Sequence, residues 1–185
     1  MKNTKRGFTL IELLVVISII GLMSSVVLAA LNDSRTKARN AERIQGMQEY
    51  TKTINLSYDK YGEYPDPGNN TTTYCITDVT DNDASANRCG NSNGVLENAT
   101  VYGLIREFMP AAKMFPTIST VASWGSPTTF EGPTYRCSVR TGGVCTTSIV
   151  VWYLEGDVPS CSFGATRSFW SFYTPTITSC TLTIR

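Results

Sequence analysis

The sequence predicts an α+β protein in which one long N-terminal helix packs, by its second half, on a C-terminal antiparallel β-sheet. Three observations support this fold class. Residues 8–31 are almost entirely apolar, no proline occurs before Pro65, and runs rich in β-branched and aromatic residues follow Thr134 with turn signals between them.

The charge composition argues against several classes of function. The formal net charge is +1, which gives no electrostatic footprint for nucleic acid. Histidine is absent, so the commonest general base and metal ligand is missing. The sequence contains no nucleophile elbow, phosphate loop or zinc-ligand spacing. We therefore expect no enzyme, no cofactor and no metal.

The apolar segment is long enough to cross a membrane. It exceeds the roughly 7–15 apolar residues of an ordinary secretory signal, and as a helix it would measure roughly 36 Å. Lys2, Lys5 and Arg6 precede it. Basic residues stay on the cytoplasmic side, so we expect the N-terminus inside and the bulk of the chain outside.

A single carboxylate, Glu12, lies near the start of this segment. An acid at the middle of a bilayer costs roughly 2.5–3.5 kcal/mol, and less near an end. Thr9 and Glu12 have the spacing of a capping box, and the helix dipole also favours an acid there. Capping explains why the acid is tolerated, but not why Gly7 separates the basic residues from the apolar run.

The stretch "KRGFTLIELLVVISIIGLM", residues 5–23, resembles the class III signal of type IV pilins and type II secretion pseudopilins. A looser similarity to pseudopilins and related pilins is "YDKYGEYPDP", at the end of the predicted long helix. Many members of this family have a proline about two turns before the apolar segment ends. Here that stretch is "SSVVLAAL", without proline.

The resemblance implies a processing pathway and a set of partners. A prepilin peptidase would cut after Gly7 and methylate the new N-terminus at Phe8, and an inner-membrane platform would assemble the mature chain into a homo-oligomeric helical filament. Glu12 would promote assembly by pairing with the Phe8 ammonium of another subunit, although its own Phe8 is also within one turn. The subunit would stay in the cytoplasmic membrane, in contact with lipid, before assembly and lie on the cell surface afterwards.

The expected organisation has four parts: a leader at 1–7, a membrane or filament-core helix at 8–31, the soluble half of the helix at 32–62, and a disulfide-stapled head at 63–185. Small residues on one face of the apolar helix would let neighbouring helices approach closely. These are Ser18, Gly21, Ser25 and Ala29.

The second half of the long helix carries an amphipathic stripe that should form the core. Its members are Ile44, Met47, Thr51, Ile54, Tyr58 and Tyr61. We expect the nearby charged residues, Arg35, Lys37, Arg39 and Arg43 among them, to form a solvated face. Gly62, Pro65 and Pro67 should end the helix.

Residues 66–94 are predicted to form a loop, and a short helix is predicted to follow in "NATVYGLIREFM". Asp78, Asp81 and Asp83 could hold calcium, but their spacing is not that of an EF-hand, so a solvated acidic loop is favoured. Four segments then predict a sheet of three or four antiparallel strands: "TYRCSVR", "TSIVVWYLE", "RSFWSFY" and "TLTIR". Trp152 and Trp170 are expected to pack in the core.

Six cysteines follow the apolar segment, which indicates an oxidising compartment and three disulfides. Pairing in sequence order is expected, because Cys137 and Cys145 flank a Gly-Gly turn and short loops close at least cost. The expected pairs are Cys75–Cys89, Cys137–Cys145 and Cys161–Cys180. The alternative crosses the last four, as Cys137–Cys161 and Cys145–Cys180.

Two classes of function remain open. The first is a structural filament subunit, and disulfide-stapled C-terminal loops favour a pilus pilin over a secretion or competence pseudopilin. The second is a membrane-anchored adhesin or binding module, or a minor pilin at the filament tip. Abundance in purified filaments would separate them.

Overall fold

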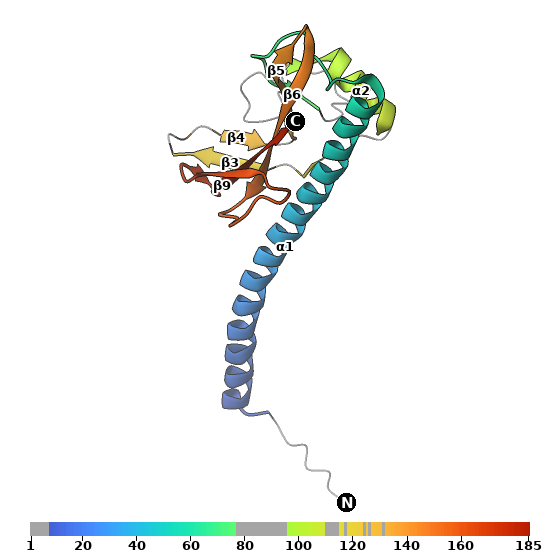
Figure 1. Ribbon diagram of the computed structural model, residues 1–185. Coiled ribbons are helices and arrows are strands. Elements are labelled where there is room, and N and C mark those ends of the chain that lie inside the picture. The colour runs from blue at the N-terminus through green and yellow to red at the C-terminus, as the bar shows by residue number, and fades with distance from the viewer. Residues whose placement is uncertain are drawn as a thin grey trace, which may run out of the picture. The chain divides into compact units, whose positions relative to one another are not determined.

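The computed structural model describes residues 8–76, 96–109, 115–116, 118–123, 125, 127–130 and 132–185. Its first element is α1 (Leu10–Tyr61), a helix of 52 residues (Figure 1). Gly62 follows at φ +75°, and its N–H donates to the Tyr58 carbonyl at 2.8 Å. Glycine tolerates this left-handed conformation, so it ends the helix as the sequence predicts.

A second helix, α2 (Ala99–Phe108), packs on the head. The Asn98 side chain caps it by accepting hydrogen bonds from the N–H groups of Thr100 and Val101, both at 3.1 Å. Val101 and Ile105 are its buried residues. Near its end, Glu107 accepts a hydrogen bond from the Tyr61 hydroxyl at 2.7 Å, which ties α2 to the end of α1.

The strands form two sheets. The larger has six strands in the order β2-β1-β5-β6-β9-β7, and every pair except β1–β2 is antiparallel. Its strands are β1 (Tyr74–Cys75), β2 (Leu96–Glu97), β5 (Thr134–Thr141), β6 (Val144–Glu155), β7 (Thr166–Trp170) and β9 (Ile177–Ile184). The smaller sheet has the order β4-β3-β8, with β3 (Ile118–Ala122), β4 (Pro127–Phe130) and β8 (Tyr173–Thr174).

The sheets differ in three respects from the predicted three or four antiparallel strands. The short strands β1 and β2, which pair in parallel, extend the larger sheet to six strands. The stretch "RSFWSFY" is not one strand, because a turn at Ser171–Phe172 divides it between β7 of the larger sheet and β8 of the smaller. Strands β3 and β4 were not predicted, although "ISTVA" alternates buried and exposed residues. A second hydrophobic cluster joins Ile118, Ala122, Phe130 and Tyr173 of the smaller sheet to Ile177 of β9, and Trp170 of β7 is partly buried against it.

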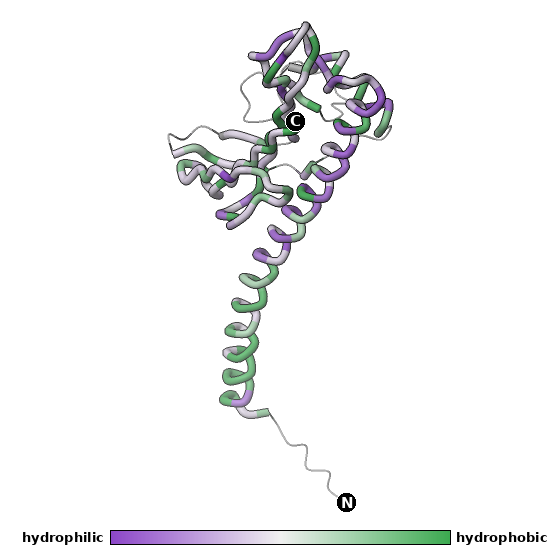
Figure 2. Tube along the Cα trace, in the orientation of Figure 1, coloured by the Kyte–Doolittle hydropathy of each residue, from purple (hydrophilic) through white to green (hydrophobic). Residues whose placement is uncertain are grey.

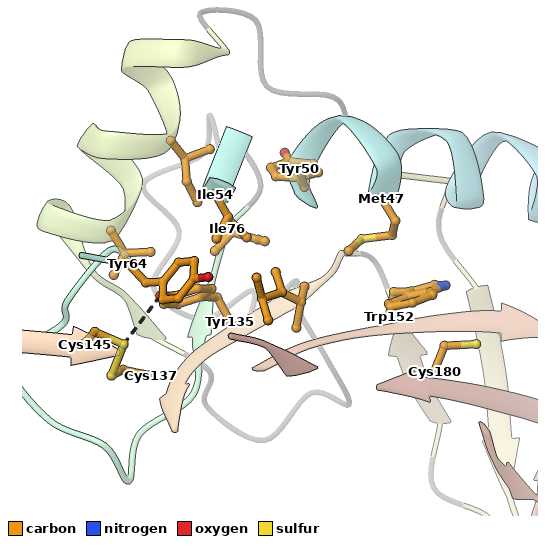
Figure 3. Packing of buried hydrophobic residues seen from close by; sticks show 14 of the residues in the cluster. Met47, Tyr50, Ile54, Tyr64, Ile76, Tyr135, Cys137, Cys145, Trp152 and Cys180 are labelled. Carbon is orange, nitrogen blue, oxygen red and sulfur yellow. Dashed lines mark hydrogen bonds between the residues drawn. A yellow bond between two sulfur atoms is a disulfide. The ribbon is translucent and has the colours of Figure 1, made fainter. Parts of the chain in front are cut away.

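The main core lies between the second half of α1 and the larger sheet (Figure 3). Met47, Tyr50 and Ile54 face Tyr135 and Trp152, and all five are at most 1% exposed.

The buried stripe of α1 is rotated relative to the predicted one. It consists of Asn40, Arg43, Gly46, Met47, Tyr50, Thr53, Ile54 and Ser57, whereas Tyr58 and Tyr61 are exposed. A Cβ at Gly46 would lie 2.9 Å from the Phe115 ring, so any larger residue there would have to displace that ring. The prediction that Arg43 lies on a solvated face is therefore wrong, because its side chain is buried.

A polar cluster anchors α1 to the end of β6. The Glu155 carboxylate accepts hydrogen bonds from Arg39 at 2.5 and 2.7 Å and from Arg43 at 3.0 Å. Asn40 exchanges two hydrogen bonds of 2.9 Å with the Glu155 backbone, and Arg43 also donates to the Pro116 carbonyl at 2.7 Å. We name Arg39, Asn40, Arg43 and Glu155 the helix clamp.

Two charged side chains of the clamp are buried, so their ion pair can contribute to the stability of the fold. The Arg43 side chain is 2% exposed and that of Glu155 is 9% exposed. Burial opposes ionisation of Glu155, but the hydrogen bonds from Arg39 and the charge of Arg43 outweigh it and hold the pKa of this carboxyl below its ordinary value. The clamp thus contributes stability while Glu155 is ionised.

Two disulfides have the pairing expected from sequence order. Cys137 and Cys145 join β5 to β6 across their hairpin, and Cys161 and Cys180 join the loop before β7 to β9. Cys75 is also disulfide-bonded, but its expected partner Cys89 lies outside the described residues, as do Asp78, Asp81 and Asp83.

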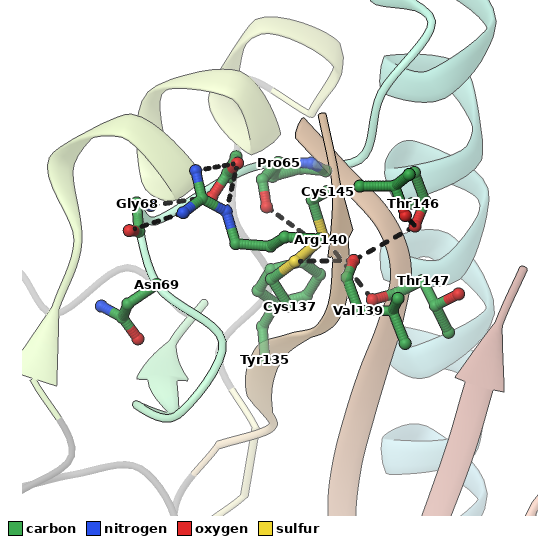
Figure 4. Close-up of a disulfide and its surroundings, with 12 residues drawn as sticks. Pro65, Gly68, Asn69, Tyr135, Cys137, Val139, Arg140, Cys145, Thr146 and Thr147 are labelled. Atoms are coloured by element: carbon green, nitrogen blue, oxygen red, sulfur yellow. Dashed lines mark hydrogen bonds and ion pairs between the residues drawn. A yellow bond between two sulfur atoms is a disulfide. The ribbon is translucent and has the colours of Figure 1, made fainter. Parts of the chain in front are cut away.

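Beside the first disulfide, hydrogen bonds fix the segment after α1 to the sheet (Figure 4). Tyr135 donates to the Pro65 carbonyl at 2.7 Å, and Arg140 reaches Asp66 at 2.9 Å and the Gly68 carbonyl at 2.9 Å. These contacts hold residues 65–68 against the sheet.

We predict that Glu155→Gln lowers the free energy of unfolding of the full chain in detergent by about 3 kcal/mol at pH 7, because Arg43 would keep a buried charge without its partner. The depressed pKa means that this stabilisation is present above about pH 4.3, the ordinary value for glutamate, and is lost as the pH falls through the lower folded value. Denaturant titrations at neutral and acidic pH should therefore show a difference between the two proteins that shrinks in acid.

Asp157→Asn is the matched control, because it breaks an ion pair with Arg167 whose Asp157 side chain is 62% exposed. Its cost should stay within about 1 kcal/mol. An equal cost for both substitutions, or a pH-independent cost for Glu155→Gln, would contradict this account of the clamp.

Candidate functional site: the N-terminal end of the first helix

The start of α1 is organised by a reciprocal cap between Thr9 and Glu12. Both the N–H and the hydroxyl of Thr9 donate to Oε2 of Glu12, at 2.8 and 2.7 Å. The Glu12 N–H in turn donates to the Thr9 hydroxyl at 3.3 Å. This is the capping box expected from the sequence, and it satisfies donors that the first helical turn would otherwise leave unpaired.

The cap holds a negative charge at the surface of an apolar rod. Among the described residues, no lysine or arginine forms an ion pair with Glu12. The neighbouring Phe8 side chain is 77% exposed. Lys5, Arg6 and Gly7, on which the expected cleavage site also depends, lie outside the described residues.

The apolar segment of α1 is exposed along its whole length. Every residue from Phe8 to Leu31 is exposed, and the exposed fraction of its large apolar residues ranges from 78% at Leu10 to 43% at Leu31. Figure 2 colours this part of α1 as hydrophobic along nearly its whole length. Its most apolar window has a mean hydropathy of 2.7, enough by length and composition to cross a membrane, and none of that window is buried. Such a surface requires a cover of lipid or protein.

The small residues of this segment share one face that is open for close packing. At 100° per residue, Ser18, Gly21, Ser25 and Ala29 fall within an arc of roughly 80°. Ser18 and Ser25 donate their hydroxyls to carbonyls of their own helix, at 2.7 and 2.8 Å, so neither needs a polar partner. A Cβ built on Gly21 would meet no atom within 4 Å.

The acid and the small-residue face lie on different sides of the helix. By the same helical geometry, Glu12 is displaced by roughly 130° from the middle of that face. A neighbouring helix packed on the small residues would therefore not be the one that meets the carboxylate. The segment can contact at least two neighbours in two distinct ways.

The Thr9–Glu12 cap and the apolar segment of α1 could be predicted from the sequence, because capping and apolar runs are local signals. The helix clamp of the head was missed, although Asn40 and Arg43 continue the 3-4 spacing of Met47, Tyr50 and Ile54.

Comparisons with known proteins agree with this picture. Residues 2–28 match the family described as the prokaryotic N-terminal methylation motif. The chain is 38% identical to a fimbrial protein of Neisseria meningitidis serogroup B over 71 residues, which are 38% of this chain and 41% of that protein. It is 35% identical to a type IV major pilin protein of Neisseria gonorrhoeae, also over 71 residues, which are 38% of this chain and 42% of that protein.

The match to the Neisseria proteins thus spans about two fifths of their length. A longer match reaches a fimbrial protein of Dichelobacter nodosus, with 32% identity over 113 residues, 56% of this chain and 70% of that protein. No solved structure matches the chain. With the exposed apolar helix and its capped glutamate, these relatives show that the chain belongs to the fimbrial-protein family of type IV pilins.

Proposed function

We propose that this protein is a structural subunit of a type IV pilus, and that it assembles through its N-terminal helix into a surface filament. The exposed apolar segment of α1 carries the proposal, because it must be covered by lipid as a monomer and can be covered by copies of itself in a filament. A helix with two different packing sides suits such an assembly, since every subunit then contacts more than one neighbour.

Two states of the protein follow from this proposal. Before assembly the apolar segment spans the cytoplasmic membrane, with the N-terminus inside and the head outside, and it contacts lipid. After assembly it lies in the filament core, where other copies replace the lipid. The partners are then the peptidase that processes the chain, the inner-membrane assembly platform and further copies of the protein.

We predict that the mature chain begins at N-methylated Phe8, because Gly7 presents a small residue to the peptidase directly before the apolar helix. Gly7→Val should leave an uncut precursor in the membrane fraction. Intact mass and N-terminal sequencing of the purified chain test this prediction. A mature protein that retains residues 1–7, or that is cut after Leu31, would show that the segment is processed as a different kind of signal.

The role of Glu12 follows from the energetics of a buried charge. In a filament core without water, burial of an unpaired Glu12 carboxylate would cost free energy. The ammonium at Phe8 of another subunit can pair with it, because that ammonium keeps its charge after methylation. The pair would fix the axial register of helices that otherwise slide on apolar surfaces. Within one subunit, the Thr9 cap holds the carboxylate ready at the helix surface.

We predict that Glu12→Ala and Glu12→Gln both leave a folded, inserted and cleaved monomer but reduce filament number about tenfold or more, since the loss of 1.4 kcal/mol per contact already changes an equilibrium tenfold. Glutamine can still accept the Thr9 hydrogen bonds, so it retains the cap and removes only the charge.

Val16→Ala is the control for this experiment, because it trims an exposed apolar side chain of the same segment without changing charge. Filament counts by electron microscopy, in cells with the variant as the sole subunit, give the measurement. If Glu12→Gln cells carry filaments in wild-type number, capping rather than intersubunit pairing is the role of this residue.

The proposed function itself is tested by shearing filaments from the cell surface, imaging them, and identifying their main component by mass spectrometry. We expect this chain to make up most of the filament mass. Its presence at trace level would instead favour a minor tip subunit or adhesin, and confinement to the membrane fraction would favour a secretion or competence pseudopilin.

A further inference from the structure

The stretch of α1 that follows the apolar segment carries an excess of positive charge. Residues 32–43 contain four basic residues and two acids. Glu155, which binds two of these basic residues in the helix clamp, adds a third acid. Four positive charges against three negative charges leave one positive charge in excess on this part of the molecule.

Arg35 is the basic residue that the fold leaves without an acid. Lys37 pairs with Asp33 at 2.7 Å, and Arg39 is bound by Glu155. Among the residues that the structure describes, no acid forms an ion pair with Arg35, which is exposed. The positions three and four residues away on either side, where a helical partner would lie, contain no acid.

Asn32 and Arg35 lie on one face of α1, at the depth of a lipid headgroup layer. At 100° per residue they are about 60° apart, whereas Asp33 is about 160° away from Arg35. They lie roughly 1.5 and 6 Å beyond Leu31, the last residue of the apolar segment. The headgroups of a bilayer extend roughly 5–7 Å beyond the hydrocarbon on each side. Both residues are exposed, so both can reach a headgroup.

We propose that Asn32 and Arg35 bind the phosphate of a phospholipid in the outer leaflet of the cytoplasmic membrane, an inference that rests on the membrane state of the proposed function. The guanidinium presents parallel N–H donors that match two oxygens of one phosphate, and the Asn32 amide donates to the same group. The acyl chains of the bound lipid cover the neighbouring apolar residues, which favours a lipid phosphate over a soluble anion. The contact fixes the depth of α1 in the bilayer before assembly.

Solid-state NMR of the full chain in vesicles of phosphatidylglycerol and phosphatidylcholine tests this contact. With ¹³C in the arginine guanidinium groups, the lipid ³¹P nuclei should dephase a guanidinium signal. An Arg6→Lys background keeps the charge of the leader but removes its guanidinium, which lies on the opposite side of the membrane. We expect dephasing in this background and its loss in Arg35→Gln. A background without dephasing, or dephasing that persists in Arg35→Gln, overturns the proposal.

Two further variants show whether the contact is specific to this face of α1. Lys37→Gln is the matched control, because it removes the same charge from the same stretch but from a residue already paired with Asp33. It should keep the dephasing of the background. Asn32→Asp places an acid three residues before Arg35, where it pairs with the guanidinium and repels phosphate, so the dephasing should be lost. Equal losses in Lys37→Gln and Arg35→Gln would indicate a general attraction of cations to the bilayer and would overturn the specific contact.

A detergent that contains no phosphorus separates a lipid from a free anion. In such micelles, added inorganic phosphate should produce no dephasing, because no acyl chain holds it beside the apolar segment. Dephasing by inorganic phosphate equal to that in vesicles would make this an anion site and would contradict the assignment to a lipid.

The NMR measurement and the filament analysis separate this proposal from the proposed function. If sheared filaments contain the chain but the vesicles show no dephasing, the phosphate contact is wrong and the proposed function stands. If the dephasing is present but filaments lack the chain, the contact stands and the filament role is wrong. A chain that fails to float with the vesicles contradicts the membrane state, and the phosphate contact is then wrong as well.

Discussion

The apolar half of α1 has to be covered by something other than its own head, and much of the molecule can be understood from that requirement. Residues from Phe8 to Leu31 are exposed on every side. In water such a rod would aggregate, because the hydrophobic effect penalises each apolar side chain left in contact with solvent. A bilayer or a bundle of identical helices removes this penalty, and transfer from one to the other exchanges one apolar environment for another. Polar groups then determine how the apolar helices associate, and Glu12 is the one acid of the segment.

The head meets a different requirement, which is to hold a long helix by one flank only. The helix clamp fixes α1 at the end of β6, and the Tyr50 region packs farther along on the sheet. Two disulfides within the core and the hydrogen bonds around Arg140 stiffen the sheet further. A subunit that is rigid before assembly loses less conformational entropy when it docks.

The elements that follow from local signals could be predicted from the sequence. Helix α1 begins within two residues of Phe8 and ends just before Gly62, because capping residues and glycine act on their immediate neighbours. The buried stripe was misplaced because the partners that compensate the buried charge of Arg43 are distant in sequence: Glu155 lies 112 residues away and Pro116 lies 73 residues away. The smaller sheet was missed for a similar reason, since β8 has two residues and exists only through its pairing with β3.

The central claim is that Glu12 makes an intersubunit ion pair that sets the register of the filament. A side-chain-resolution structure of the assembled filament by electron cryomicroscopy tests it most directly. The account predicts the Glu12 carboxylate within about 4 Å of the Phe8 amine of a different copy, as an ion pair requires. A filament in which Glu12 contacts only Thr9 and Phe8 of its own chain would contradict it.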